Sequence, residues 1–256
     1  MRNIKGIIQY DGTGYKGWQT QKDSLTIQGL ITNCLTILTR QSVKIIGSGR
    51  TDAGAHAIEQ VISFKILSDI NLQKLLKSIN AILPEQIRVL SLEEVSLDFN
   101  PRYDAKEKTY LYIIDNNHSI SPFISKYVWN LPFKLNIENM IKAALMFIGE
   151  HDFSAFTVLD RESKDCVRKI NDFKIFFHKK ISFMNFSLEG NFIVIEITAN
   201  GFLRYMVRNI VGTLVDIGRG KIKHKHLQSI FDSKDRRLAG VKAPAKGLFL
   251  KKVFYE

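Results

Sequence analysis

Residues 71–84 read NLQKLLKSINAILP, and this stretch carries the clearest structural signal in a chain of 256 residues. Its large apolar residues recur every three or four positions, which is the spacing of one buried helix face, at Leu72, Leu75, Leu76, Ile79 and Ile82. Asn71 is a favoured N-cap residue, and Pro84 cannot continue a helix. The pattern therefore predicts a helix that begins after Asn71 and is stopped by Pro84.

Strands and a second helix flank this segment in a recognisable order. Apolar and β-branched runs typical of strands occupy 4–10, 43–47, 60–66 and 87–95, and residues 27–38 repeat the helical spacing. The order is strand-helix-strand-strand-helix-strand, which is the split βαβ or ferredoxin-like arrangement.

The second half of the chain nearly repeats this order. Its patterns predict strands at 108–114, 169–177, 181–188, 192–199 and 247–254, and helices at 137–148 and 203–217. We therefore predict an α+β protein of two ferredoxin-like halves, 1–104 and 105–256. Their antiparallel or mixed sheets are expected side by side, with helices on the outer face and a cleft between the halves.

Composition narrows the class of protein. Hydrophobic residues make up 45% and charged residues 24%, as in ordinary folded proteins. The apolar runs fall far short of the roughly 20 residues of a membrane span. Lys5 and Asp11 interrupt any apolar core of a secretion signal. Two cysteines cannot form a disulfide framework. We expect a cytoplasmic protein with no membrane association.

The chain is strongly basic, with 37 Lys and Arg against 25 Asp and Glu, a net charge of +12. Between Arg219 and Lys252 there are eleven Lys and Arg and only two Asp. Such an excess favours a polyanionic partner, because neutralised phosphates release counterions. A merely solvated basic surface would give the same composition.

Residues 12–17, GTGYKG, match the glycine pattern of dinucleotide-binding loops. That fingerprint requires a helix opening at the glycines and an acidic residue about 20 positions further on. Here Trp18 and Gln19 follow, and no Asp or Glu occurs between Asp23 and Asp52. We interpret the segment as a glycine-rich turn or as a loop that approaches a phosphate backbone.

A second loop, GSGRTDAGAHA at 47–57, is more informative. Its small residues would let the carboxylate of Asp52 approach a substrate without steric blockade. The guanidinium of Arg50 would favour the ionised carboxylate through a charge-assisted hydrogen bond. The alternative is an Arg–Asp pair that only staples a turn. His56 is a possible base, although a lone histidine near an aspartate is more often structural.

Glu150, His151 and Asp152 are the strongest candidate for a metal site, but no second cluster of ligands accompanies them. We therefore predict no metal, and a turn at the end of a helix that packs Phe153 and Phe156 into the core.

Six motifs in order along the chain resemble the TruA family of tRNA pseudouridine synthases. They are YDGTGYKGWQ at 10–19, GRTDAGAHA at 49–57, KTYLY at 108–112, GEHDFSAF at 149–156, FLRYMVRN at 202–209 and APAKGL at 243–248. The chain departs from the family pattern at Ala55, where valine is expected, and at Arg204-Tyr205 before the Met-Val-Arg segment.

The resemblance implies isomerisation of uridine to pseudouridine at positions 38, 39 and 40 of the tRNA anticodon stem-loop. It implies no cofactor or metal, and a homodimer in which one tRNA crosses from one subunit to the active site of the other. The rival interpretation is a non-catalytic RNA-binding protein with two aromatic sheets and a basic rim.

The resemblance also assigns roles to residues. Asp52 is the essential carboxylate, acting at the ribose C1′, at the base C6 or at C2′. Arg208 is its cationic partner, and Tyr110 stacks against the target base. Arg204, expected four residues before Arg208 on one side of a helix, would then contact phosphate. Arg50 is expected to contact the flipped nucleotide or its phosphate. Which of the three arginines pairs with Asp52 stays open.

Overall fold

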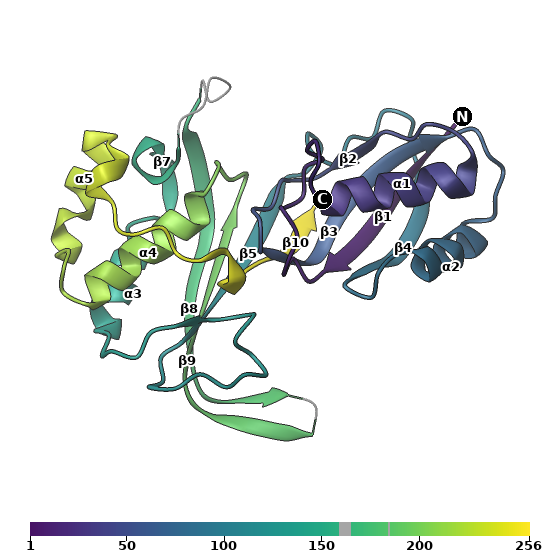
Figure 1. Ribbon diagram of the computed structural model, residues 1–256. Helices are drawn as coiled ribbons and strands as arrows, with labels where there is room; N and C mark the ends of the chain where they lie inside the picture. Colours follow the sequence, from purple (N-terminus) through teal and green to yellow (C-terminus); the bar gives the residue numbers. More distant parts are fainter. Residues whose placement is uncertain (159–164, 184) are drawn as a thin grey trace. The chain divides into compact units, whose positions relative to one another are not determined.

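The structure is a computed structural model that describes residues 1–158, 165–183 and 185–256. The chain forms two compact units, Met1–Lys106 with Phe249–Glu256, and Glu107–Leu248 (Figure 1). Each unit combines a sheet with helices, which confirms the predicted α+β class. The side-by-side placement of the two sheets and the cleft between them stay predictions.

The first unit has the predicted strand-helix order. Its elements are β1 (Arg2–Tyr10), α1 (Ile27–Thr39), β2 (Ile45–Gly47), β3 (His56–Ile66), α2 (Leu72–Ile82), β4 (Ile87–Val95) and β10 (Leu248–Phe254). The sheet runs β4-β1-β3 with antiparallel pairs, and β2 is antiparallel to β3. Helices α1 and α2 pack against each other on one face of this sheet (Figure 1). This is the split βαβ arrangement.

Local signals explain where α2 begins and ends. The side chain of Asn71 accepts hydrogen bonds from the backbone amides of Gln73 and Lys74, so two of the first free N–H groups are satisfied. Leu75 and Ile79 lie buried at the centre of the apolar stripe. The helix spans the residues that the spacing predicts.

The final strand of the chain returns to the first unit. Strand β10 pairs in parallel with β3, with Phe249 opposite His56 and Leu250 opposite Ala57. The amide of Lys106 also donates to the carbonyl of Phe254. The residues after Leu248 therefore complete the sheet that contains β1 and β3.

The second unit contains a sheet with longer strands and three α-helices among its described residues. Its elements are β5 (Glu107–Asp115), β6 (Trp129–Asn130), α3 (Ile137–Leu145), β7 (Gly149–Asp152), β8 (Val167–Phe183), β9 (Phe186–Ala199), α4 (Met206–Gly218) and α5 (Leu227–Ser233). The strand order is β5-β9-β8-β7, and α3 packs on α4. A cluster of contacting phenylalanine rings forms part of the core, from Phe147, Phe153, Phe156 and Phe231. None of the helices among the described residues is both long and apolar enough to cross a membrane.

Two expectations for the second unit were wrong. The three strands predicted between 169 and 199 are two long strands, β8 and β9, paired as a hairpin. The polar residues 178–180, which interrupt the apolar pattern, lie at a register shift within β8 and not at a turn. Helix α4 begins at Met206 and not at 203, because Tyr205 adopts a left-handed conformation with φ 63°.

Candidate active site

The acidic loop, residues 48–55 between β2 and β3, carries Arg50 and Asp52. The backbone carbonyl of Asp52 accepts a hydrogen bond of 3.1 Å from the amide of Ala55, and Gly54 has a φ of 78°. This tight turn leaves Asp52 half-buried and Arg50 exposed. The carboxylate is therefore partly shielded, whereas the guanidinium is available to solvent and to a ligand.

Buried side chains from β1 and β3 hold the residues that precede Asp52. The hydroxyl of Tyr10 lies 2.7 Å from Oγ1 of Thr51. The side chain of Gln60 accepts from the Ser48 hydroxyl at 2.5 Å and donates to the Gly49 carbonyl at 2.9 Å. These four polar side chains, Tyr10, Ser48, Thr51 and Gln60, are nearly inaccessible to solvent. We call them the loop-anchoring network.

Burial also extends the pH range over which the Tyr10 hydroxyl of the network stays protonated. It raises the pKa of Tyr10 far above its usual value, and the hydrogen bonds to Thr51 and Gln60 oppose this rise only in part. The Tyr10 hydroxyl therefore remains neutral. Buried polar groups that are all paired fix one arrangement of the chain, because breaking any pair leaves an unsatisfied group.

The glycine-rich loop, residues 11–17, packs directly against the acidic loop. The amide of Trp18 donates to the Thr51 carbonyl at 3.1 Å. A Cβ on Gly12 would overlap the carbonyl group of Ala55, and a Cβ on Gly17 would lie 2.8 Å from the Thr51 carbonyl oxygen. Helix α1 begins only at Ile27. The glycines therefore allow two loops to touch, and no helix opens at them as a dinucleotide site requires.

His56 closes the other side of the acidic loop and is 1% exposed. Its Nδ1 accepts a hydrogen bond from the Gly12 amide at 3.0 Å and lies 3.1 Å from a carboxylate oxygen of Asp11. Its ring stacks on Phe249 with centroids 4.6 Å apart. This enclosed position indicates a packing role.

The loop-anchoring network leads to a first prediction, which concerns stability. Tyr10→Phe removes one hydroxyl and leaves Oγ1 of Thr51 without that partner in a dry environment. The free energy of unfolding should fall by about 1–3 kcal/mol, as measured by urea denaturation. Tyr103→Phe is the matched control, since Tyr103 is 76% exposed, and it should leave the free energy of unfolding unchanged. Equal stability of the two variants would show that the network does not hold the loop.

The remaining predicted site residues lie in the second unit. Tyr110 on β5 is 7% exposed, and its ring meets Phe202 edge-on at 4.9 Å. Tyr112, two residues further along the strand, is wholly buried and donates to the carbonyl of Pro244 at 2.7 Å. Tyr112 is therefore a core residue, and Tyr110 retains a small accessible edge.

The prediction that Arg204 and Arg208 lie on one side of the same helix was wrong. Arg204 precedes α4, and Arg208 lies in its first turn, because the left-handed Tyr205 separates them. Both guanidinium groups nevertheless lie close to the Tyr205 ring, with Cζ atoms 4.9 and 5.4 Å from its centroid. Nε of Arg208 also donates to the Ala243 carbonyl at 2.7 Å.

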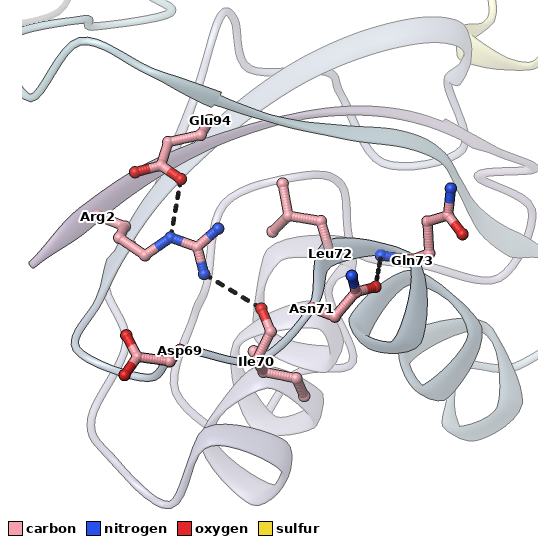
Figure 2. A pocket seen from close by; sticks show the side chains of 7 residues that line it. All are labelled: Arg2, Asp69, Ile70, Asn71, Leu72, Gln73 and Glu94. Atoms are coloured by element: carbon pink, nitrogen blue, oxygen red, sulfur yellow. Dashed lines mark hydrogen bonds and ion pairs between the residues drawn. The ribbon is translucent and has the colours of Figure 1, made fainter.

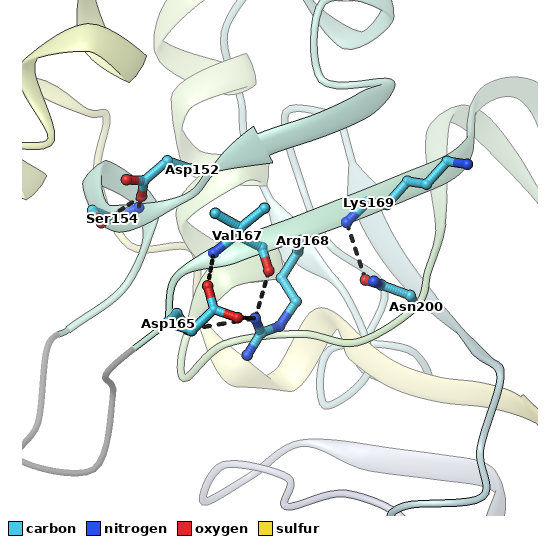
Figure 3. Close-up of polar contacts among 7 residues, drawn as sticks. All are labelled: Asp152, Ser154, Asp165, Val167, Arg168, Lys169 and Asn200. Carbon is cyan, nitrogen blue, oxygen red and sulfur yellow. Dashed lines mark hydrogen bonds and ion pairs between the residues drawn. The ribbon is translucent and has the colours of Figure 1, made fainter.

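Asp152 and His151 make structural contacts, and Figure 3 shows those of Asp152 with Ser154. One carboxylate oxygen of Asp152 accepts from the amide and hydroxyl of Ser154, and the other lies 2.8 Å from Nζ of Lys234. The His151 ring stacks on Phe231 at 4.9 Å. Among residues 1–158, 165–183 and 185–256, no group of three or more His, Cys, Asp or Glu is placed to hold a metal ion.

A cavity of about 670 Å³ lies elsewhere in the first unit (Figure 2). It is lined by Arg2, Asp69, Ile70, Asn71, Leu72, Gln73 and Glu94. Arg2 starts β1, whereas the acidic loop contacts Tyr10 at the end of that strand. Arg2 already binds Glu94 at 2.8 Å and the Ile70 carbonyl at 3.1 Å. The cavity is therefore separate from Asp52, and its one cation is already paired.

Comparisons with known proteins show the family to which the chain belongs. The profile of a family described as tRNA pseudouridine synthase matches residues 7–104 and 143–256. The chain is 44% identical to tRNA pseudouridine synthase A of Thermodesulfovibrio yellowstonii and 43% identical to that of Thermoanaerobacter pseudethanolicus, each over 100% of both chains. A chain of a Cbf5-Nop10-Gar1 crystal structure matches 82% of this chain and 54% of its own length, with 10% identity and a TM-score of 0.33, too low to support an argument.

The chain therefore belongs to the tRNA pseudouridine synthase family, a class of isomerases that act on tRNA. The family match includes the acidic loop, the glycine-rich loop and the α4 region.

Proposed function

We propose that this protein converts uridine to pseudouridine at positions 38, 39 and 40 of the tRNA anticodon stem-loop, with Asp52 as the essential carboxylate. The observation that carries the proposal is the held acidic loop. A half-buried Asp52 sits on a turn whose neighbours Thr51, Ser48 and Gly49 are tied to buried strand side chains. A protein that only binds RNA has no need for a carboxylate fixed beside small residues.

The reaction rearranges one nucleotide without adding or removing atoms. The N1–C1′ bond breaks, the base rotates, and a C5–C1′ bond forms. The proton on C5 leaves, and N1 gains a proton. Asp52 acts at C1′, at C6 or at C2′, and in each route it must be ionised and close to the sugar or base. Because no electron is transferred and no group is imported, we propose that neither a metal nor a cofactor takes part.

The other site residues supply charge and a flat apolar surface. We assign Arg208 as the cation that favours the ionised form of Asp52. Tyr110 stacks on the target base once it has left the helical stack, an extrusion that costs a few kcal/mol. The exposed Arg50 contacts the flipped nucleotide or its phosphate. Arg204 contacts backbone phosphate.

The proposal also covers the oligomeric state of the protein and the way it recognises tRNA. Three adjacent target positions favour recognition of tRNA shape over base edges. We propose a homodimer in which one tRNA spans two subunits, acting in the cytoplasm, where its substrate matures.

Mapping of modified nucleotides tests this proposal directly. An unmodified tRNA transcript with uridines at 38, 39 and 40 is incubated with the protein in EDTA, derivatised with carbodiimide and read by primer extension. Stops are expected at these positions, and not in a transcript carrying cytidine there. Stops confined to other positions would contradict the assigned target, and activity that is lost in EDTA and restored by zinc would contradict the metal-free reaction.

A further inference from the structure

The ring of Tyr205 is surrounded by three cationic side chains. Nζ of Lys242 lies 4.3 Å from the ring centroid, and the Cζ atoms of Arg204 and Arg208 lie 4.9 and 5.4 Å from it. Arg204 and Lys242 are exposed, whereas Arg208 is half-buried. We call Arg204, Tyr205 and Lys242 the cation platform. Because all three positive groups lie close to one ring, they repel one another, and a bound anion would relieve this repulsion.

The backbone of Tyr205 is part of the arrangement. Its φ of 63° places a bulky residue in the left-handed region, a strained conformation that persists only where the surroundings impose it. The same conformation delays the start of α4 to Met206 and separates Arg204 from the helix. A regular helix beginning at 203 would instead place Arg204 along the helix with Arg208.

Lys242 reaches the platform through a segment that runs closely along α4. The Gly240 amide donates to Oγ1 of Thr213 at 2.9 Å, and the Val241 amide donates to a carboxylate oxygen of Asp216 at 3.1 Å. Gly212 has no side chain, and a Cβ there would overlap the Val241 carbonyl group. The exposed Lys242 is therefore held by backbone contacts on either side, since the Ala243 amide also donates to the Arg208 carbonyl at 3.1 Å.

The local charge is positive along both contributing segments. No Asp or Glu lies between Glu196 and Asp216, nor between Asp235 and Glu256. Helix α4 has 13 residues and no acidic residue in its first turn. Its macrodipole adds partial positive charge at that end. The attraction between an exposed cation and an aromatic ring is weak, so the ring gathers the charges without neutralising them.

We propose that Arg204 and Lys242, gathered by Tyr205, bind one backbone phosphate of the RNA substrate. The inference rests on the proposed function, because it takes the polyanion to be tRNA, and it adds Lys242 as a binding residue and Tyr205 as a positioning residue. Two cations on one ring hold a phosphate between them more firmly than two independent mobile side chains do, because less conformational freedom is lost on binding.

The salt dependence of RNA binding tests the inference. We expect Lys242→Gln to weaken binding of an unmodified tRNA transcript several-fold at 100 mM salt and to reduce the slope of log K against log salt by about one. Lys77→Gln removes the same charge from the exposed side of α2 in the other unit and should leave the slope unchanged. Equal slopes for the two variants, with equal melting temperatures, would overturn the inference.

Two variants of Tyr205 distinguish the effect of its ring on tRNA affinity from the effect of its backbone strain. Tyr205→Phe keeps the ring and should bind tRNA as the unaltered protein does. Tyr205→Gly relieves the left-handed strain, so it should fold stably, yet it should lose affinity as Lys242→Gln does. Tight binding by Tyr205→Gly would show that the ring does not gather the cations.

Two further arms identify the anion and separate this inference from the proposed function. If free phosphate is the ligand, inorganic phosphate at millimolar concentration should displace the tRNA transcript at constant ionic strength. If phosphate displaces no more transcript than chloride does, the ligand is a phosphate of the RNA backbone. A protein that forms no pseudouridine but shows the reduced slope in Lys242→Gln would contradict the proposed function alone. Normal pseudouridine formation with an unchanged slope would contradict the phosphate site alone.

Discussion

Asp52→Asn should abolish pseudouridine formation while leaving tRNA affinity within a few fold of the unaltered protein. The amide has nearly the shape of the carboxylate, so the turn closed by the Ala55 amide remains. It has no negative charge and cannot act as a nucleophile or accept a proton at the sugar. We expect the single-turnover rate to fall by at least about 10³-fold, as for other essential catalytic groups. Release of tritium from C5-labelled uridine in tRNA measures this rate.

Asp69→Asn provides the matched control for this loss. Asp69 is an exposed carboxylate of the same unit and lines the separate cavity near Arg2 (Figure 2). Its replacement should leave both the rate and the affinity unchanged. Turnover by Asp52→Asn at the normal rate would remove Asp52 from the mechanism, and a matching loss in Asp69→Asn would move the site to that cavity.

Gly12→Ala should produce the second large effect, because the new methyl group would overlap the Ala55 carbonyl. The two loops must then separate, and the acidic loop moves away from its anchored position. We expect a loss of about 1–3 kcal/mol or more in the free energy of unfolding and at least a hundredfold lower activity in the soluble fraction. Thermal denaturation and the tritium-release rate measure the two effects.

Gly14→Ala is the control for backbone strain in the same loop. Gly14 has a φ of 83°, but a Cβ there would meet nothing within 4 Å. This substitution should cost about 1–2 kcal/mol from the left-handed conformation alone and leave the rate per folded molecule unchanged. If Gly12→Ala and Gly14→Ala behave alike, the contact between the loops does not position Asp52.

The parts of the fold that could be predicted from the sequence are those specified by local signals. Helix α2 could be predicted because Asn71 caps its start and Pro84 follows its end within two positions. The long hairpin of β8 and β9 could not, because the polar residues 178–180 look like a turn until their pairing with β9 shows a register shift. Tyr205 was missed for a related reason, since a left-handed tyrosine is rare enough that no local rule predicts it.

Local sequence signals likewise predict some parts of the candidate site and not others. The small residues around Asp52 mark the loop, and the family resemblance marks the residue. The loop-anchoring network could not be predicted, because it depends on the register of two distant strands, in which Ile8 lies opposite Gln60 and Tyr10 opposite Ala57. One available signal was Gln60 at the start of the predicted strand 60–66, since an amide that becomes buried needs partners. Lys242 gave no such signal, because it is one lysine among many in a basic segment.

The return of β10 to the first unit has a consequence for how the protein is made. The strand that pairs with β3 and supplies Phe249 beneath the His56 ring is translated only after residues 107–248. A nascent chain that has emerged only as far as Lys106 therefore has an unfinished sheet edge beside the Asp52 turn. Strand β10 is the last strand of this unit to be synthesised. A polypeptide that stops before residue 248 would therefore lack the strand that pairs with β3 next to the acidic loop.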